Sequence, residues 1–274
     1  MKISVVIPTY NRYEPLKRAL RSIYCQSHQP VEVIVIDDGS TDNTSKIAED
    51  FPKIKYFYQG NRGVSSARNR GIKESTSDWI AFLDSDDEWH KYKLEEQVKL
   101  HKKDKTLYMS YTDERWVRDS QTVNIPKKFK KFGGDIFENN LSHCIIAPSS
   151  ALIHKKLFKS VGLFDEDLEV CEDYDLWLRI SLKHKIGLVN QKLITKHGGE
   201  NDQLSYKHWG MDRFRVQSLE KILKKKTAKD RVTFDMLLKK YELLLKGAMR
   251  HDKYYDVKDY KSKIEFYKKR YKHY

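Results

Sequence analysis

The sequence predicts an α/β fold, with an open, mixed and mostly parallel sheet flanked by helices and a helical extension at the C-terminus. Two observations carry this prediction. Apolar, β-branched runs alternate with amphipathic segments over the first ~100 residues, as in parallel sheets whose strands are joined by helical crossovers. After Gly210 the apolar residues recur at helical spacing only.

The predicted elements of the first part alternate strictly. Residues 3–7 (Ile-Ser-Val-Val-Ile) and 31–36 (Val-Glu-Val-Ile-Val-Ile) are typical of buried strands. A helix over 42–50 would have Ser40 or Thr41 as its N-cap. The further expected elements are helices at 14–24, 64–73 and 90–103 and strands at 54–58 and 78–83.

The pattern is less regular from residue 107 onward. We expect strands at 107–111 and 149–153, with a mobile, Lys-rich surface loop at 127–135 between them. A helix over 173–184 and a short hairpin over 186–196 follow. Helices at 211–225, 230–247 and 257–270 complete the prediction.

The net charge of +14 is concentrated near the C-terminus. Residues 215–274 hold 19 Lys and Arg against 8 Asp and Glu, a net +11, so residues 1–214 are nearly neutral. A nucleic-acid enzyme needs a positive active groove, and this distribution argues against nucleic acid as a partner.

Cysteine usage and hydropathy point to the cytoplasm. The three cysteines are odd in number and far apart, which indicates neither a disulfide framework nor a zinc site. The short apolar run at the N-terminus stops at Pro8, which is not typical of a signal peptide, and no stretch approaches the ~18 apolar residues of a spanning helix.

Polar motifs follow three of the predicted strands. They are Pro8-Thr9-Tyr10, Asp37-Asp38-Gly39-Ser40 and Asp84-Ser85-Asp86-Asp87. Ligands of open parallel sheets bind beyond the carboxyl ends of the strands, so we expect the three motifs to converge on one site.

The third motif favours a divalent metal. Its carboxylates at the mouth of a buried strand would repel one another, and Mg²⁺ or Mn²⁺ relieves such repulsion while binding substrate phosphates. A turn followed by an acidic helix start is the alternative interpretation.

The second motif and the helix after it suit a nucleotide. A carboxylate at this strand end can accept a hydrogen bond from a base or ribose, and we assign Asp38 to the base. Arg68 could contact the base or a phosphate, or lie at the surface. No Gly-x-Gly-x-x-Gly follows the first strand and no Gly-x-x-x-x-Gly-Lys-Ser/Thr occurs, so a dinucleotide site and a P-loop are unsupported.

Five motifs together resemble the family 2 glycosyltransferases of GT-A fold, an inverting family found in bacterial surface-polysaccharide synthesis. The likeness covers about residues 3–205 in the family's order. The motifs are Ser4-Val5-Val6-Ile7-Pro8-Thr9-Tyr10-Asn11-Arg12, Asp37-Asp38-Gly39-Ser40, Ala67-Arg68-Asn69-x-Gly71, Phe82-Leu83-Asp84-Ser85-Asp86-Asp87 and Glu172-Asp173-Tyr174-Asp175-Leu176-Trp177-Leu178-Arg179.

The resemblance implies direct displacement at the anomeric carbon of a nucleotide-diphosphate sugar, with UDP as the expected nucleotide. It implies a catalytic domain over 1–210, with the donor in 1–105 and the acceptor in 106–210, and a basic extension over 211–274. The implied donor-binding residues are Pro8, Thr9, Tyr10, Arg12, Asp37, Asp38, Arg68, Asp84 and Ser85. The implied metal ligands are Asp84 and Asp86, with His197 nearby; a surface histidine in a turn is the alternative for His197.

Asp173 matches the family's general base, and the chemistry supports this independently. A hydroxyl nucleophile needs a carboxylate within hydrogen-bond reach, while a metal would neutralise the departing diphosphate. Glu172 is the alternative base, and an acidic first helical turn is the non-catalytic interpretation. The Gln-x-x-Arg-Trp signature that resembles processive synthases is missing, which favours single addition.

The acceptor is expected to be a glycan or a lipid-linked oligosaccharide. The Lys/Arg and Tyr mixture of 211–274 suits an anionic membrane surface, where it would place the enzyme at the inner membrane face. A solvated helical face is the alternative. A non-catalytic nucleotide-sugar-binding protein and a sugar nucleotidyltransferase remain the rival functions.

Overall fold

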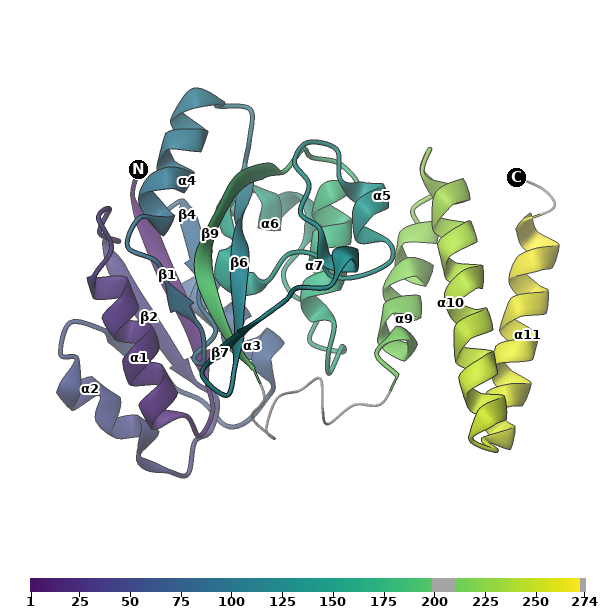
Figure 1. Cartoon of the computed structure of the whole chain (residues 1–274), viewed down its shortest axis with the longest axis horizontal. Helices are drawn as coiled ribbons and strands as arrows, with labels where there is room; N and C mark the ends of the chain where they lie inside the picture. The colour runs from purple at the N-terminus through teal and green to yellow at the C-terminus, as the bar shows by residue number, and fades with distance from the viewer. Residues whose placement is uncertain (199–209, 272–274) are drawn as a thin grey trace.

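The computed structural model of the chain describes residues 1–198 and 210–271 (Figure 1). The sheet has nine strands in the order β3-β2-β1-β4-β8-β6-β9-β5, with β7 paired to β6. The strands are β1 (Ile3–Thr9), β2 (Glu32–Asp37), β3 (Lys55–Tyr58), β4 (Trp79–Phe82), β5 (Glu88–Trp89), β6 (Met109–Arg118), β7 (Gln121–Val123), β8 (Leu152–His154) and β9 (Gly187–Gly198).

Helices cover the sheet and continue beyond it. Those of the first 200 residues are α1 (Tyr13–Tyr24), α2 (Ile47–Asp50), α3 (Val64–Glu74), α4 (Lys93–Lys103), α5 (Phe137–Asn140), α6 (Lys155–Val161) and α7 (Glu172–Ser181). The C-terminal helices are α9 (Asp212–Leu223), α10 (Asp230–Arg250) and α11 (Tyr254–Tyr271), which stand side by side at one end of the molecule (Figure 1).

β1 organises the parallel half of the sheet. It pairs in parallel with β2 and β4, and its side chains alternate between two cores. Val5 and Ile7 join the core that includes α1, whereas Val6 joins the core that includes α3. A Cβ on Gly71 of α3 would lie 2.2 Å from a methyl carbon of Val6, so glycine lets α3 approach the sheet. The predicted α/β fold is confirmed.

The predicted hairpin over 186–196 is wrong. β9 is one continuous strand that pairs in parallel with β6 and antiparallel with β5. The register shifts beside it, because Thr112 opposes Val189 while Asp113 opposes Lys192. The polar pair at 190–191, which resembles a turn in sequence, is therefore accommodated as a bulge.

Two further local predictions need correction. The N-cap after β2 is Asp42, whose side chain accepts a hydrogen bond from the Thr44 amide at 2.9 Å, and not Ser40 or Thr41. The loop 127–135 is not all surface, because Lys131 forms a buried ion pair with Glu114 at 3.1 Å and donates to the Ile145 carbonyl at 2.6 Å.

An apolar cluster and a buried lysine are among the contacts that hold the C-terminal helices against the α/β part of the chain. The cluster joins Tyr174 and Leu178 of α7 to side chains from α9, α10 and α11. Lys240 of α10 donates to the Ser142 carbonyl and to Asp212, both at 2.8 Å. Among the residues described, no helix is long and apolar enough to cross a membrane.

Glu220 ties the three C-terminal helices together. Its Oε1 accepts hydrogen bonds from Tyr241 (2.7 Å) and Tyr267 (2.8 Å), and Lys263 lies at 3.1 Å. We expect Glu220→Ala to lower the free energy of unfolding by about 2–4 kcal/mol, because it leaves two buried hydroxyls without their acceptor. Urea unfolding measures this loss.

Glu242→Ala is the matched control. Glu242 of α10 forms an ion pair with Lys268 of α11 at 3.2 Å, but both side chains are more than half exposed. Such pairs contribute about 0–1 kcal/mol, so this variant should unfold close to the wild type. Equal losses in the two variants would show that Glu220 does not hold the helices together.

Candidate active site

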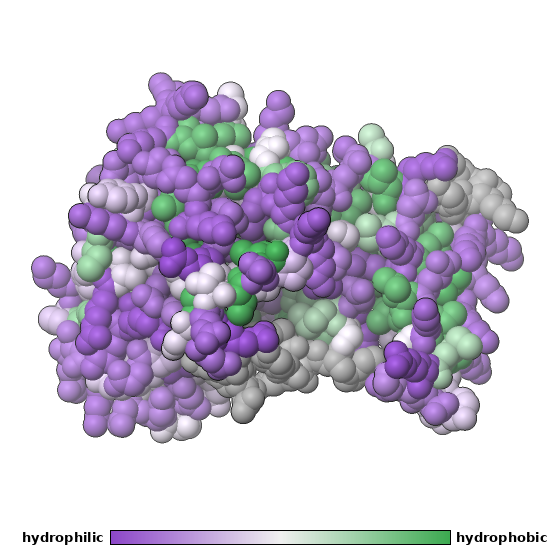
Figure 2. Space-filling view, in the orientation of Figure 1, coloured by the Kyte–Doolittle hydropathy of each residue, from purple (hydrophilic) through white to green (hydrophobic). Residues whose placement is uncertain are grey.

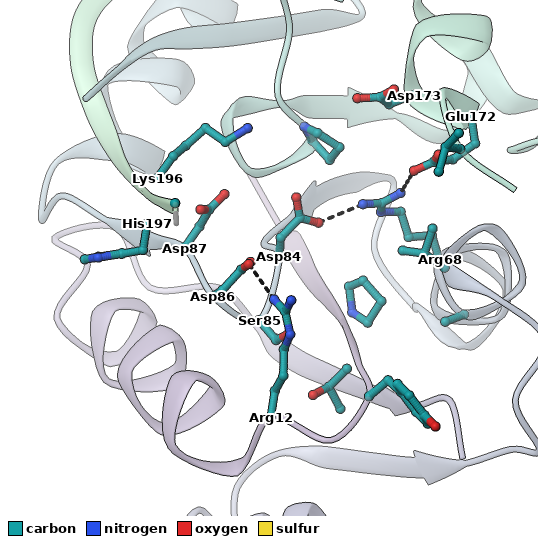
Figure 3. Close-up of a pocket in the computed structure, with 18 of the residues that line it drawn as sticks. Arg12, Arg68, Asp84, Ser85, Asp86, Asp87, Glu172, Asp173, Lys196 and His197 are labelled. Carbon is teal, nitrogen blue, oxygen red and sulfur yellow. Dashed lines mark hydrogen bonds and ion pairs between the residues drawn. The ribbon is translucent and has the colours of Figure 1, made fainter. Parts of the chain in front are cut away.

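The three strand-end motifs meet in one cavity of about 890 Å³ (Figure 3). It lies at the carboxyl ends of β1 and β4, where the sequence predicts a ligand site. The lining residues at the ends of β1, β2 and β4 and in the loops that follow them are Pro8, Thr9, Tyr10, Asn11, Arg12, Asp38, Asp84, Ser85, Asp86 and Asp87. Glu172, Asp173 and His197 line it as well.

Asp37 does not reach this cavity, which corrects its assignment to the donor site. Its side chain is fully buried. One carboxylate oxygen accepts from the Tyr56 hydroxyl at 2.5 Å and the other from the Ser40 amide at 2.8 Å. Asp37 therefore shapes the turn that presents Asp38.

Asp38 lines the cavity and is held by the loop before α3. Its Oδ2 accepts from the Gly63 amide at 2.8 Å. Its Oδ1 accepts from the Arg62 amide at 3.0 Å and from Gln59 at 2.8 Å. These contacts fix the carboxylate without an ion pair among the residues described, so it can accept a further hydrogen bond from a ligand.

Arg68 is buried, so the alternative of a surface arginine is wrong. Its guanidinium donates to Asp84 Oδ1 at 2.7 Å and to Glu172 Oε1 at 2.5 Å (Figure 3). It thereby joins the acidic motif after β4 to the first turn of α7. The positive charge of Arg68 holds the pKa of Asp84 below its usual value against the opposing effect of burial.

The acidic motif contains two partly buried carboxylates, Asp84 and Asp86, and one buried carboxylate, Asp87. Asp86 forms an ion pair with Arg12, and Asp87 accepts a hydrogen bond from Ser149 at 2.5 Å. Burial, with the charge of Asp86 next in size, raises the pKa of Asp87 well above its usual range. Asp87 therefore supports the motif, while Asp84 and Asp86 carry its charge.

The residues present fit a divalent cation only in part. Arg68 takes one oxygen of Asp84 and Arg12 one oxygen of Asp86, which leaves one oxygen of each for a cation. No group of three His, Cys, Asp or Glu that could hold a metal occurs among the described residues. His197 instead lies 2.7 Å from Glu88. Two carboxylates suffice for Mg²⁺ or Mn²⁺ only when substrate phosphates complete the shell.

The first turn of α7 brings two carboxylates to the opposite wall. Cys171 precedes it in the left-handed conformation, with φ of 64°. Glu172 pairs with Arg68, and burial raises its pKa to about 7. Asp173 accepts from its neighbour's amide at 2.6 Å and from the Cys144 thiol at 3.3 Å. Asp173 therefore faces the cavity without an ion pair among the residues described.

Several lining residues were not foreseen from the sequence. Trp116, Val117 and Arg118 at the end of β6 line the cavity, although the sequence indicated a strand only to residue 111. Met211, just before α9, and Lys196 of β9 line it as well. Its position next to His197 in the sequence is the signal that could have identified Lys196 as a site residue.

Comparison with known proteins is consistent across sequence and structure. The family model described as Glycosyl transferase family 2 matches residues 4–162. An uncharacterized glycosyltransferase of Rickettsia conorii is 36% identical over 205 residues, covering 73% of this chain and 34% of the relative. The chain thus spans about a third of the length of that relative.

Two bacterial proteins match more of their own length. TuaG of Bacillus subtilis, provisionally named as a teichuronic acid biosynthesis glycosyltransferase, is 24% identical over 76% of this chain and 82% of its own. TarS 1–349 of S. aureus, solved in complex with UDP-GlcNAc, superposes with a TM-score of 0.70 at 21% identity, over 87% of this chain and 71% of that one.

The similarity to TarS confirms the expected GT-A fold. The family match covers more than half of the 274 residues and includes the motifs at residues 8–12, 37–40 and 84–87. The chain therefore belongs to glycosyltransferase family 2.

Proposed function

We propose that the protein is an inverting glycosyltransferase that moves a sugar from a UDP-linked donor to a hydroxyl of a glycan or lipid-linked oligosaccharide. The observation that carries the proposal is that one cavity holds Asp38, the pair Asp84 and Asp86, and Asp173. These groups suit a nucleoside, a diphosphate and an attacking hydroxyl, respectively. The TarS complex with UDP-GlcNAc supports the choice of UDP.

The donor would lie along the sheet edge. Pro8, Thr9 and Tyr10 provide the wall beside Asp38, whose carboxylate can accept a hydrogen bond from the base. The diphosphate would then reach Asp84 and Asp86. A divalent cation bound there, Mn²⁺ or Mg²⁺, would act as a Lewis acid that neutralises the departing diphosphate.

Asp173 would act as the general base. The acceptor oxygen forms a bond to the anomeric carbon, the bond from that carbon to the diphosphate oxygen breaks, and the hydroxyl proton passes to Asp173. Attack on the face opposite the diphosphate inverts the anomeric centre. Glu172 suits this role less well, because Arg68 already occupies one of its oxygens at 2.5 Å.

The acceptor would lie against the end of β6 and the first turn of α7, which both line the cavity. The similarity to a protein named for teichuronic acid biosynthesis supports an acceptor used in cell-surface polysaccharide synthesis. A nucleotidyltransferase or a simple nucleotide-sugar-binding protein has no need for a base opposite the donor's diphosphate. The effect of replacing Asp173 therefore separates the proposal from both rivals.

We expect Asp173→Asn to reduce sugar transfer by about 10²–10⁴-fold, because the amide cannot take the hydroxyl proton. UDP should still bind, since Asp38 and the pair Asp84 and Asp86 are unchanged in this variant. Transfer is measured as UDP release in the presence of acceptor, and binding by calorimetry. Asp167→Asn is the matched control, because Asp167 is exposed in the loop before α7 and does not line the cavity. Undiminished transfer by Asp173→Asn would disprove the base assignment.

The turn between α10 and α11 provides a candidate contact with an anionic membrane. Met249, Tyr254 and Tyr255 are 57%, 79% and 93% exposed there. Figure 2 shows further apolar side chains at the surface over α10 and α11. In Figure 1 this turn and the carboxyl ends of β1 and β9 all lie toward the bottom of the view. A membrane that contacts the turn would therefore face the cavity's side of the protein.

Vesicle binding tests this contact. We expect the protein to sediment with phosphatidylglycerol vesicles and not with phosphatidylcholine vesicles, because the C-terminal helices carry most of the net positive charge. Tyr255→Ser should weaken sedimentation several-fold, since aromatic side chains bind at the interface. Tyr92→Ser is the control, because it removes an exposed tyrosine (52% exposed) that lies outside these helices. Equal sedimentation of both variants and the wild type would exclude the turn as the contact.

A further inference from the structure

The cations around the cavity differ in how they are paired. Arg12 forms an ion pair with Asp86, and Arg68 is shared by Asp84 and Glu172. Arg118 lines the rim and is exposed. Lys196 also lines the cavity, yet its side chain has no ion pair or hydrogen bond within the described part of the chain.

The position of Lys196 follows from strand pairing. On β9 it lies opposite Trp116 of β6, so both side chains point to the same face of the sheet. Figure 3 shows its side chain extending into the cavity, with the ammonium between Asp87 and Asp173. The half-buried ammonium therefore occupies the space between the acidic motif and the candidate base.

Carboxyl groups surround this ammonium. Glu114, Asp84 and Asp173 are among the groups that act on the charge of Lys196, and Asp84 and Asp173 line the same cavity. Glu114 already has a cation of its own in Lys131, with which it forms a buried ion pair. The positive charge of Lys196 is therefore available to a ligand in the cavity, whereas Arg12 and Arg68 are held by carboxylates.

We propose that Lys196 binds the diphosphate of the donor. A diphosphate that enters between Asp84 and Asp173 meets carboxylates on both sides, and a cation in this position offsets their repulsion. An ammonium on a flexible stem is a common phosphate ligand in proteins. The inference rests on the proposed function, and it adds a protein cation to the metal expected at Asp84 and Asp86.

Comparison of UDP with uridine isolates the phosphate contribution. The dissociation constants of both are measured by calorimetry for the wild type and for Lys196→Met, in Mn²⁺ and in EDTA. We expect Lys196→Met to weaken UDP binding by about tenfold or more, as for loss of a charge-assisted hydrogen bond, and to leave uridine binding unchanged. The effect should persist in EDTA, because it does not depend on a metal.

Two further variants complete the design. Lys192→Met, on the same strand but exposed and outside the cavity, should bind both ligands as the wild type does. Lys196→Arg keeps the charge and should retain most of the preference for UDP. If Lys196 only balances the neighbouring carboxylates, Lys196→Met will melt at a lower temperature but keep the wild-type ratio of UDP to uridine affinity.

The outcomes separate this inference from the proposed function. Wild-type binding of UDP together with an unchanged affinity ratio in Lys196→Met overturns the role of Lys196 alone. A wild-type protein that binds no UDP overturns the proposed donor and this inference together. A ratio that falls in Lys196→Met and recovers in Lys196→Arg supports both.

Discussion

The buried guanidinium of Arg68 is the interaction on which the site depends. It reaches from α3 to Asp84 after β4 and to Glu172 at the start of α7, so it joins the two walls of the cavity. Gly71, three residues further along α3, makes this possible because only glycine lets the helix lie against Val6 of β1. The short segment from Arg68 to Gly71 therefore sets both the packing of α3 and the width of the site.

The charges that line the cavity bear on how the proposed donor and cation would bind. Its walls carry Asp84, Asp86 and Asp173, and Arg68 and Arg12 offset only part of this negative charge. These carboxylates would oppose the binding of a diphosphate. A divalent cation at the acidic motif and the ammonium of Lys196 would together reverse the sign of the potential where the phosphates would lie.

Local sequence patterns predicted the parts of the fold that depend on local physics. The β-branched run of β1 and the spacing of α1 gave correct elements, because burial on both faces of a parallel sheet leaves a strong signal. The three strand-end motifs were expected to meet, and they do, since parallel strands end at one edge. The roles assigned to these residues stay predictions.

The features that the sequence did not predict correctly depend on contacts between distant segments. The bulge in β9 depends on its pairing with β6, which no local pattern at 190–191 reveals. Asp37 was expected in the donor site beside Asp38, but its carboxylate accepts a hydrogen bond from the Tyr56 hydroxyl of β3 and does not line the cavity. No local pattern distinguishes Lys196 from other basic strand residues, because its place in the cavity depends on its pairing opposite Trp116. In each case the deciding neighbour lies far away in the chain.

The most direct measurement is a thermal-shift series with UDP, GDP, dTDP and CMP, each with and without Mn²⁺. A ligand that binds only the folded state raises the melting temperature, and the rise is larger for tighter binding. We expect UDP to raise the melting temperature and Mn²⁺ to enlarge the rise, because a cation held by Asp84 and Asp86 would offset the negative charge of the diphosphate. No shift with any of the four nucleotides, in either condition, would contradict a nucleotide-sugar site in this cavity.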